Sequence, residues 1–167
     1  ASLSVTAGGA VTDSGTLAIS GATTLNSGSA DITLDQSGST FGTLAITGAN
    51  VAVTENAAMD LGASTISGTA SFNSTSNAIT DSGTLAITGA TTLNSGSADI
   101  TLNEAASTFG TLAITGTNVA VTENATMDLG ASTISGTASF NSSNNAITDS
   151  GTLAITGVTT LNSGSAD

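Results

Sequence analysis

Apolar residues along this chain recur at every second position, in short runs separated by small polar residues. The clearest pairs are Leu17 and Ile19, Ile32 and Leu34, Leu44 and Ile46, and Met59 and Leu61. A spacing of two is the period of a β-strand, whereas an amphipathic helix repeats its apolar positions every three or four residues. The pattern therefore predicts short strands along the whole chain and no helix.

A long internal repeat organises these strands. The segment that begins at Asp13, DSGTLAI, returns at Asp81 and Asp149, so the repeat period is 81 − 13 = 68. Residues 15–82 and 83–150 are complete repeats and differ at only nine positions, while 1–14 and 151–167 are partial repeats. We expect one continuous domain over 1–167 that is an excerpt of a longer array.

A shorter unit lies inside each long repeat. The phrase Gly-x-x-x-Ile-x-Gly begins at Gly15, Gly42 and Gly62, and the next repeat starts at Gly83, so successive spacings are 27, 20 and 21. The basic unit is therefore about 20 residues, with three units in each long repeat. The first unit is longer by seven residues, 35–41, which are matched by 103–109 and predict an inserted loop.

One unit of this kind cannot bury its apolar face alone, but units stacked about 4.8 Å apart share one core. Each unit has room for three short strands with corners at Gly21, at Gly28 and near the unit boundary. The sequence thus predicts an all-β parallel β-solenoid with triangular three-strand rungs, wound right-handed as parallel crossovers are. The residues expected inside are Leu17, Ile19, Ile32, Leu44, Ile46 and Ile66.

The amino-acid composition excludes most kinds of catalytic chemistry. The 167 residues include no Lys, Arg, His, Cys, Trp, Tyr or Pro, and twelve acids give a net charge of −12. Without His, Cys or Lys there is no ordinary general base near neutral pH, no thiolate and no Schiff-base amine. We therefore expect no enzyme, no catalytic residue and no cofactor. The negative charge excludes nucleic acid as a partner, and no apolar run reaches the roughly 20 residues of a membrane span.

The acids are the remaining candidates for chemistry. Asp31, Asp35, Glu55, Asp60 and Asp81 match no EF-hand loop and no glycine-rich calcium repeat. We interpret them as solvated charges, with weak calcium binding between filaments as an alternative. Paired carboxylates could hydrolyse a polysaccharide, but a catalytic cleft should be unique instead of recurring in every long repeat.

Small residues are expected to point outward from the first strand of each unit. They would form a flat strip that packs against a second solenoid, binds ice or is simply solvated. The strip comprises Thr16, Ala18, Ser20, Thr43, Ala45, Thr47, Ala63, Thr65 and Ser67. Four asparagines are expected to form hydrogen bonds at corners: Asn26, Asn73, Asn94 and Asn141.

The seven-residue insert is the candidate interaction loop. Four of the nine differences between the two complete repeats fall at 35–38 against 103–106, whereas Phe41 and Phe109 are retained. We expect the loop to project once every third rung along one edge, with the Phe side chain anchoring its base. The candidate residues are Asp35, Gln36, Ser37, Gly38, Ser39, Thr40, Phe41, Asn103, Glu104, Ala105, Ala106, Ser107, Thr108 and Phe109.

Rungs such as GTLAITGATTLNSGSADITL, at 83–102, give the chain a resemblance to a known family. With their length near 20 residues and their Gly, Ala, Thr and Ser content, they resemble the repeat regions of bacterial surface adhesins of the filamentous haemagglutinin and autotransporter-passenger type. The resemblance implies a secreted, right-handed β-helix involved in adhesion, aggregation or biofilm formation. The function expected is therefore a structural extracellular filament or adhesin shaft at the cell surface.

Such a shaft would self-associate end to end or side by side and meet a cell-surface or matrix receptor. An ice-binding solenoid is the alternative function, and a carboxylate-based polysaccharide hydrolase is the third.

Overall fold

The computed structural model describes residues 1–165, and within them the chain forms 21 strands and no helix. Accordingly, no helix in this range is long and apolar enough to span a membrane. The strands belong to two sheets, here called sheet 1 and sheet 2, and every pairing within them is parallel.

Sheet 1 has eleven strands and sheet 2 has ten. Sheet 1 contains β1 (Leu3–Thr6), β3 (Thr23–Asn26), β5 (Thr43–Gly48), β7 (Met59–Leu61), β8 (Ser64–Ile66), β10 (Ile79–Asp81), β11 (Leu85–Ile87), β13 (Ile100–Leu102), β15 (Val119–Thr122), β18 (Ala138–Asn141) and β21 (Thr159–Asn162). Sheet 2 contains β2 (Val11–Thr12), β4 (Ile32–Leu34), β6 (Val51–Thr54), β9 (Ala70–Asn73), β12 (Thr91–Asn94), β14 (Thr111–Gly116), β16 (Met127–Leu129), β17 (Ser132–Ile134), β19 (Ile147–Asp149) and β20 (Leu153–Ile155).

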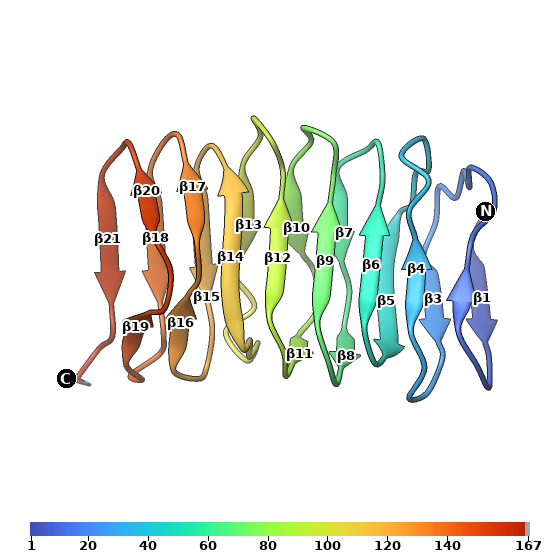
Figure 1. Ribbon diagram of the computed structural model, residues 1–167, viewed down its shortest axis with the longest axis horizontal. Helices are drawn as coiled ribbons and strands as arrows, with labels where there is room; N and C mark the ends of the chain where they lie inside the picture. Colours follow the sequence, from blue (N-terminus) through green and yellow to red (C-terminus); the bar gives the residue numbers. More distant parts are fainter. Residues whose placement is uncertain (166–167) are drawn as a thin grey trace.

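The chain alternates between the two sheets and advances by one strand spacing per turn. In sheet 2, for example, Val11 pairs with Ile32, Ile32 with Val51 and Val51 with Ala70. Each of these steps is about 20 residues, so the fold is a parallel β-solenoid of about eight turns, as the sequence predicts. In Figure 1 the strands nearest the viewer run upward, those behind run downward and the chain advances from right to left, so the winding is right-handed.

Several turns hold three short strands, as the sequence predicts, but these strands form two sheet-forming sides instead of three. Gly62 lies at a unit boundary, where the sequence predicts a corner, but β7 and β8 on either side of it pair with the two halves of the single strand β5. Leu44 pairs with Leu61 and Thr47 with Thr65, so the β7–β8 side carries one residue more than β5, as in a β-bulge. The glycine therefore accommodates an extra residue within one side of the turn.

The long repeat spans three and a half turns instead of the three units expected. Strand β5 lies in sheet 1, whereas β14, its equivalent in the next long repeat, lies in sheet 2. Likewise β3 lies in sheet 1, β12 in sheet 2 and β21 in sheet 1 again. One repeat is thus related to the next by half a rotation about the solenoid axis combined with a translation of 3.5 turns, about 17 Å at about 4.8 Å per turn.

Side chains that point between the sheets form one continuous core. Ile32, Leu44, Ile46 and Ile66 are at most 1% exposed, and Leu17 and Ile19 are partly buried against them. Two of the four aromatic rings of the sequence, Phe72 and Phe140, also lie deep in this core. The predicted core is confirmed.

The corners use asparagine side chains as expected. The Asn26 Oδ1 accepts a hydrogen bond from the Gly28 amide, and Asn94 does the same for Gly96. Asn73 and Asn141 bind the amides of Thr75 and Ser143 at the corresponding corners. The first two corners need a left-handed residue, which glycine supplies at φ 63° and 57°.

Candidate functional site

The insert emerges where the chain passes from one sheet to the other. Residues 35–41 connect β4 to β5, and 103–109 connect β13 to β14. The exposed residues of each insert are among its first four: Asp35, Ser37 and Gly38 are exposed and Gln36 is half-buried, with the same pattern at 103–106. We call 35–38 and 103–106 the insert tips. They are the positions at which the two repeats differ most.

An aspartate of the preceding turn holds the start of each tip. The Asp13 Oδ1 accepts a hydrogen bond from the Asp35 amide at 3.2 Å. In the next repeat Asp81 binds two amides, those of Asn103 at 2.8 Å and Glu104 at 3.2 Å. These aspartates therefore fix the direction in which the chain leaves the solenoid.

The second half of the insert is part of the solenoid itself. The Ser39 Oγ accepts a hydrogen bond from the Leu17 amide at 3.1 Å, and the Thr40 amide donates to the Leu17 carbonyl at 2.8 Å. The Ile19 amide in turn donates to the Thr40 carbonyl at 2.9 Å. Ser39 is fully buried and Phe41 is 4% exposed. Phe41 is thus buried at the base of the insert, as expected for an anchor.

A buried glutamate closes the insert from the following turn. The Glu55 Oε2 accepts a hydrogen bond from the Phe41 amide at 2.8 Å, and the amide of Asn56 donates to the Ser39 carbonyl at 2.7 Å. In the next repeat the Glu123 Oε2 binds the Phe109 amide at 3.1 Å. Both glutamates are 0% exposed, and the Oε1 atom of each lacks a hydrogen-bond partner.

Burial raises the pKa of these two carboxyls. Desolvation moves the pKa of Glu55 from 4.5 to about 7 and that of Glu123 from 4.5 to about 8, and the single amide hydrogen bond only partly opposes the shift. The interpretation of Glu55 as a solvated charge is therefore wrong. The sequence held the signal: Val51, Val53 and Glu55 occupy alternate positions, so the strand that buries the valines also directs the glutamate inward.

The other acids within residues 1–165 are exposed or half-buried, and most accept hydrogen bonds. The Asp60 Oδ2 binds the hydroxyl groups of Thr43 at 2.7 Å and Ser82 at 2.9 Å, which lie on the turns before and after it. The solvated-charge interpretation thus also missed a structural role for Asp60. A carboxylate at this place connects three successive turns.

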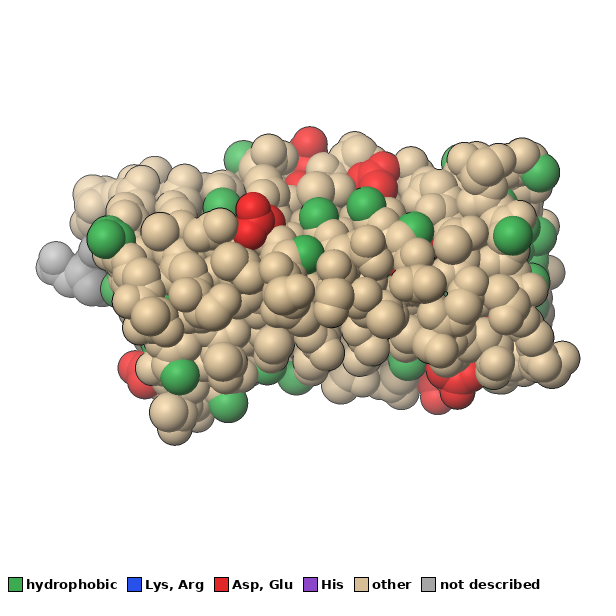
Figure 2. All heavy atoms as spheres, turned by 90° about the horizontal axis from the view of Figure 1, so that it is seen from above, with side chains coloured by type: hydrophobic (Ala, Val, Ile, Leu, Met, Phe, Trp, Pro, Cys, Tyr) green, Lys and Arg blue, Asp and Glu red, His purple; other side chains and the backbone are tan. Residues whose placement is uncertain are grey.

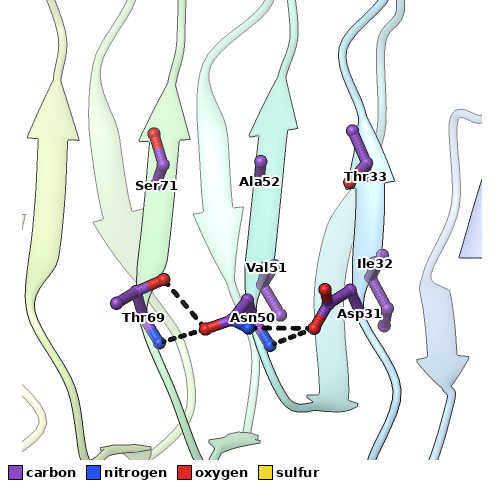
Figure 3. A pocket seen from close by; sticks show the side chains of 8 residues that line it. All are labelled: Asp31, Ile32, Thr33, Asn50, Val51, Ala52, Thr69 and Ser71. Carbon is purple, nitrogen blue, oxygen red and sulfur yellow. Dashed lines mark hydrogen bonds between the residues drawn. The ribbon is translucent and has the colours of Figure 1, made fainter. Parts of the chain in front are cut away.

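Asp31 lies in a shallow hollow on sheet 2, shown in Figure 3. Its Oδ1 accepts hydrogen bonds from the backbone amide and the side-chain Nδ2 of Asn50, both at 3.0 Å. The Asn50 Oδ1 accepts from the amide and hydroxyl of Thr69, both at 3.1 Å. Asp99 and Asn118 repeat the arrangement on the opposite sheet. The polar groups in this hollow therefore form a ladder of hydrogen bonds that joins adjacent turns.

Small residues do point outward, but not in the columns that the sequence analysis expected. Alignment of the units at their first glycines predicts Thr47 beside Ser67 and Thr43 beside Ala63, whereas Thr47 pairs with Thr65 and Thr43 with Asp60. Ala45 pairs with Thr24. A continuous outward column of sheet 2 consists of Thr12, Thr33, Ala52, Ser71, Thr92 and Ala113. Figure 2 shows acidic side chains scattered singly among uncharged ones. Within residues 1–165 no group of three or more acidic side chains could hold a metal ion.

One family model matches the chain, in three consecutive segments: residues 1–47, 48–115 and 116–167. Its description is "Repeats of unknown function (DUF5649)". The chain belongs to this family. No curated protein and no solved structure matches it.

The middle segment of that match is as long as the internal repeat. It begins at Gly48, and the next segment begins at Gly116, the equivalent residue of the following copy. A family repeat of this length corresponds to three and a half turns, so the two insert tips leave opposite edges of the solenoid. In Figure 1 the connection after β4 lies at the top and the one after β13 at the bottom. The expected row of loops along one edge is therefore wrong.

Proposed function

We propose that this chain is a rigid shaft of an extracellular structural filament or adhesin, and that its insert tips make the contacts with partners. The observation that supports the proposal most directly is the contrast between the tips and their bases. The two inserts share the same Ser, Phe and Glu contacts at their bases, whereas all four tip residues differ between the repeats. A fixed base with a variable exposed tip is typical of a binding loop on a scaffold.

The construction of the shaft supports a mechanical role. Each turn is hydrogen-bonded to its neighbours through two parallel sheets, and inward side chains form one core along the axis. Bending the rod would break ladder hydrogen bonds on one side and expose apolar side chains. A chain built in this way holds its tips at fixed distances and directions.

Weak contacts made by tips of this size gain strength only when many act together. A four-residue tip buries far less than the roughly 800 Å² per partner of a stable interface. Several tips on one rod would raise the overall affinity through the effective concentration of linked sites. We therefore expect partners that are themselves repetitive, such as a cell surface, an extracellular matrix or the side of a second copy.

The test is a bead-adhesion assay on matrix-coated surfaces, combined with electron microscopy of the protein at high concentration. One variant carries Gly-Ser-Gly-Ser at both 35–38 and 103–106, and the matched control carries Thr33→Ser and Thr92→Ser on the face of sheet 2. We expect the tip variant to keep its β-sheet circular dichroism and to lose adhesion and bundling, whereas the control keeps both. Equal adhesion and bundling by the tip variant and the natural sequence would refute the role of the tips.

The ice-binding alternative requires a regular outward lattice. In the outward column of sheet 2 the threonines are interrupted irregularly by Ala52, Ser71 and Ala113, so hydroxyl and methyl groups do not form a regular array. This irregularity favours the shaft. Measurement of thermal hysteresis and ice-crystal shape tests the ranking, because either effect would place ice binding first.

A further inference from the structure

Two carboxyl groups are buried in a protein that has no cationic side chain to neutralise them. Glu55 and Glu123 are 0% exposed, and the sequence contains no Lys, Arg or His. Each glutamate has one hydrogen bond, to the amide of Phe41 or Phe109, while its second oxygen has no partner. An ionised carboxylate in such a place lacks most of the hydrogen bonds that water would supply.

These glutamates lie at the joint between the insert and the shaft. Residues 39–41 are held on one side by Leu17 and Ile19 and on the other by Glu55 and Asn56. The same contacts recur around Ser107 and Glu123. Loss of the glutamate contact would leave that side of the insert base with the Asn56 or Asn124 hydrogen bond, while the ladder to the previous turn remains.

The ionisable groups on and beside each insert are acidic. Asp35 and its hydrogen-bonding partner Asp13 accompany the first insert, and Glu104 and Asp81 accompany the second. They offer no positive charge that would favour ionisation of the buried glutamates. Beyond the single amide hydrogen bond, a charge on Glu55 or Glu123 can therefore be stabilised only by water, which is reached by opening the insert base.

We propose that Glu55 and Glu123 are pH-sensitive locks that hold the insert bases closed when protonated and release them when ionised. The locks sit at the base of each tip and so control the mobility of the tips. They act on the insert whatever the tip binds, so the inference does not require the proposed adhesive role.

The direction of the effect follows from the raised pKa values. The folded pKa of about 7 for Glu55 and about 8 for Glu123 exceeds the ordinary value of 4.5, so the closed form binds a proton more tightly than the open form. The closed form is fully favoured below pH 4.5 and loses that advantage as the pH rises through about 7 and about 8. Neutral and mildly alkaline media should therefore loosen the inserts.

The experiment is amide hydrogen exchange of the full chain between pH 5 and pH 9, expressed as protection factors so that the intrinsic pH dependence of exchange is removed. We expect protection of the Phe41 and Phe109 amides to fall at least about tenfold over this range, since one pKa unit corresponds to a factor of ten. Core amides such as Leu93, which exchange only when the whole solenoid unfolds, should stay far better protected than the two Phe amides at every pH. Equal protection of the Phe and core amides, or no loss at the two Phe amides, would overturn the proposal.

A single substitution provides an internal control. In E55Q the amide of Phe41 should become insensitive to pH, because glutamine keeps an oxygen acceptor and cannot ionise, while Phe109 keeps its pH dependence through Glu123. The variant D35N/E104Q removes two surface charges, and each new residue is the one that the other repeat has at the equivalent position. This variant should behave like the natural sequence. Continued pH dependence at Phe41 in E55Q would show that another group is responsible.

Carboxyl-carbon resonances of the natural chain offer a readout that requires no variant. Glu55 and Glu123 should titrate well above the ordinary glutamate value of 4.5, so ionisation of either below pH 5 would also contradict the lock.

Discussion

Thr23 and Thr91 are equivalent residues of consecutive repeats, yet Thr23 pairs with Leu44 in sheet 1 and Thr91 pairs with Leu112 in sheet 2. Both threonines are fully buried, and neither side-chain hydroxyl has a hydrogen-bond partner. The same sequence thus builds the same environment on both sides of the solenoid. Each long repeat contains an odd number of half-turns, so consecutive repeats are related by half a rotation although their residues pack in the same way.

The half-rotation predicts the distance between the two insert tips. Spin labels at S37C and A105C, in a chain with no other cysteine, should lie about 35 Å apart. This estimate combines 3.5 turns of about 4.8 Å along the axis with about 30 Å across a side of roughly nine residues. Double electron–electron resonance measures the distance, and a value below about 20 Å would place both tips on one edge.

Stability should decline as the pH rises through the neutral range. A pKa raised from 4.5 to about 7 for Glu55 corresponds to about 3 kcal/mol of folding free energy that is present at low pH and lost at high pH. Urea unfolding at pH 5 and pH 9 measures the change. The variant E55Q/E123Q should show a nearly constant unfolding free energy over this range, and a decline as steep as that of the natural chain would contradict the prediction.

The base of the second insert should be more sensitive than its tip. In Ser107→Ala the amide of the buried Leu85 loses its acceptor, which should cost about 1–3 kcal/mol. The substitution Ala105→Ser, at the exposed tip, should change stability by no more than about 0.5 kcal/mol. Chemical denaturation distinguishes the two, and a neutral Ser107→Ala would mean that 107–109 are not part of the ladder.

Phe72 is one of the largest fully buried side chains, so its truncation should destabilise the core strongly. It is 1% exposed and is stacked between Val53 and Leu93. Phe72→Ala would leave a cavity and should destabilise the fold by about 3–5 kcal/mol. The neighbouring outward residue Ser71 provides the control, because Ser71→Ala should be nearly neutral in the same denaturation experiment.

Much of this fold follows from the alternation of apolar and small residues. The strand period at Leu44 and Ile46, together with the short repeat unit, was sufficient to predict a parallel solenoid and its core. The number of sides per turn did not follow, because a glycine such as Gly62 can mark either a corner or a break within one side. Only the pairing of both β7 and β8 with β5 distinguishes the two.

The candidate site, too, could be predicted only in part from the sequence. The variable tip could be recognised from the differences between repeats, and the burial of Phe41 from its apolar character. Glu55 was missed because an acidic residue at an inward position runs against the usual exposure of charged side chains. Its burial depends on the Phe41 amide, which approaches from the preceding turn.

The half-turn carried by each repeat also bears on how arrays of this kind change length. One long repeat could be gained or lost, for instance, by unequal recombination between the nearly identical copies. Every surface feature beyond the new junction would then face the opposite side of the rod. Gain or loss of two would restore the original facing. Odd and even numbers of copies would therefore give rods that present the same terminal features in opposite directions, so copy number alone could change what a neighbouring surface meets.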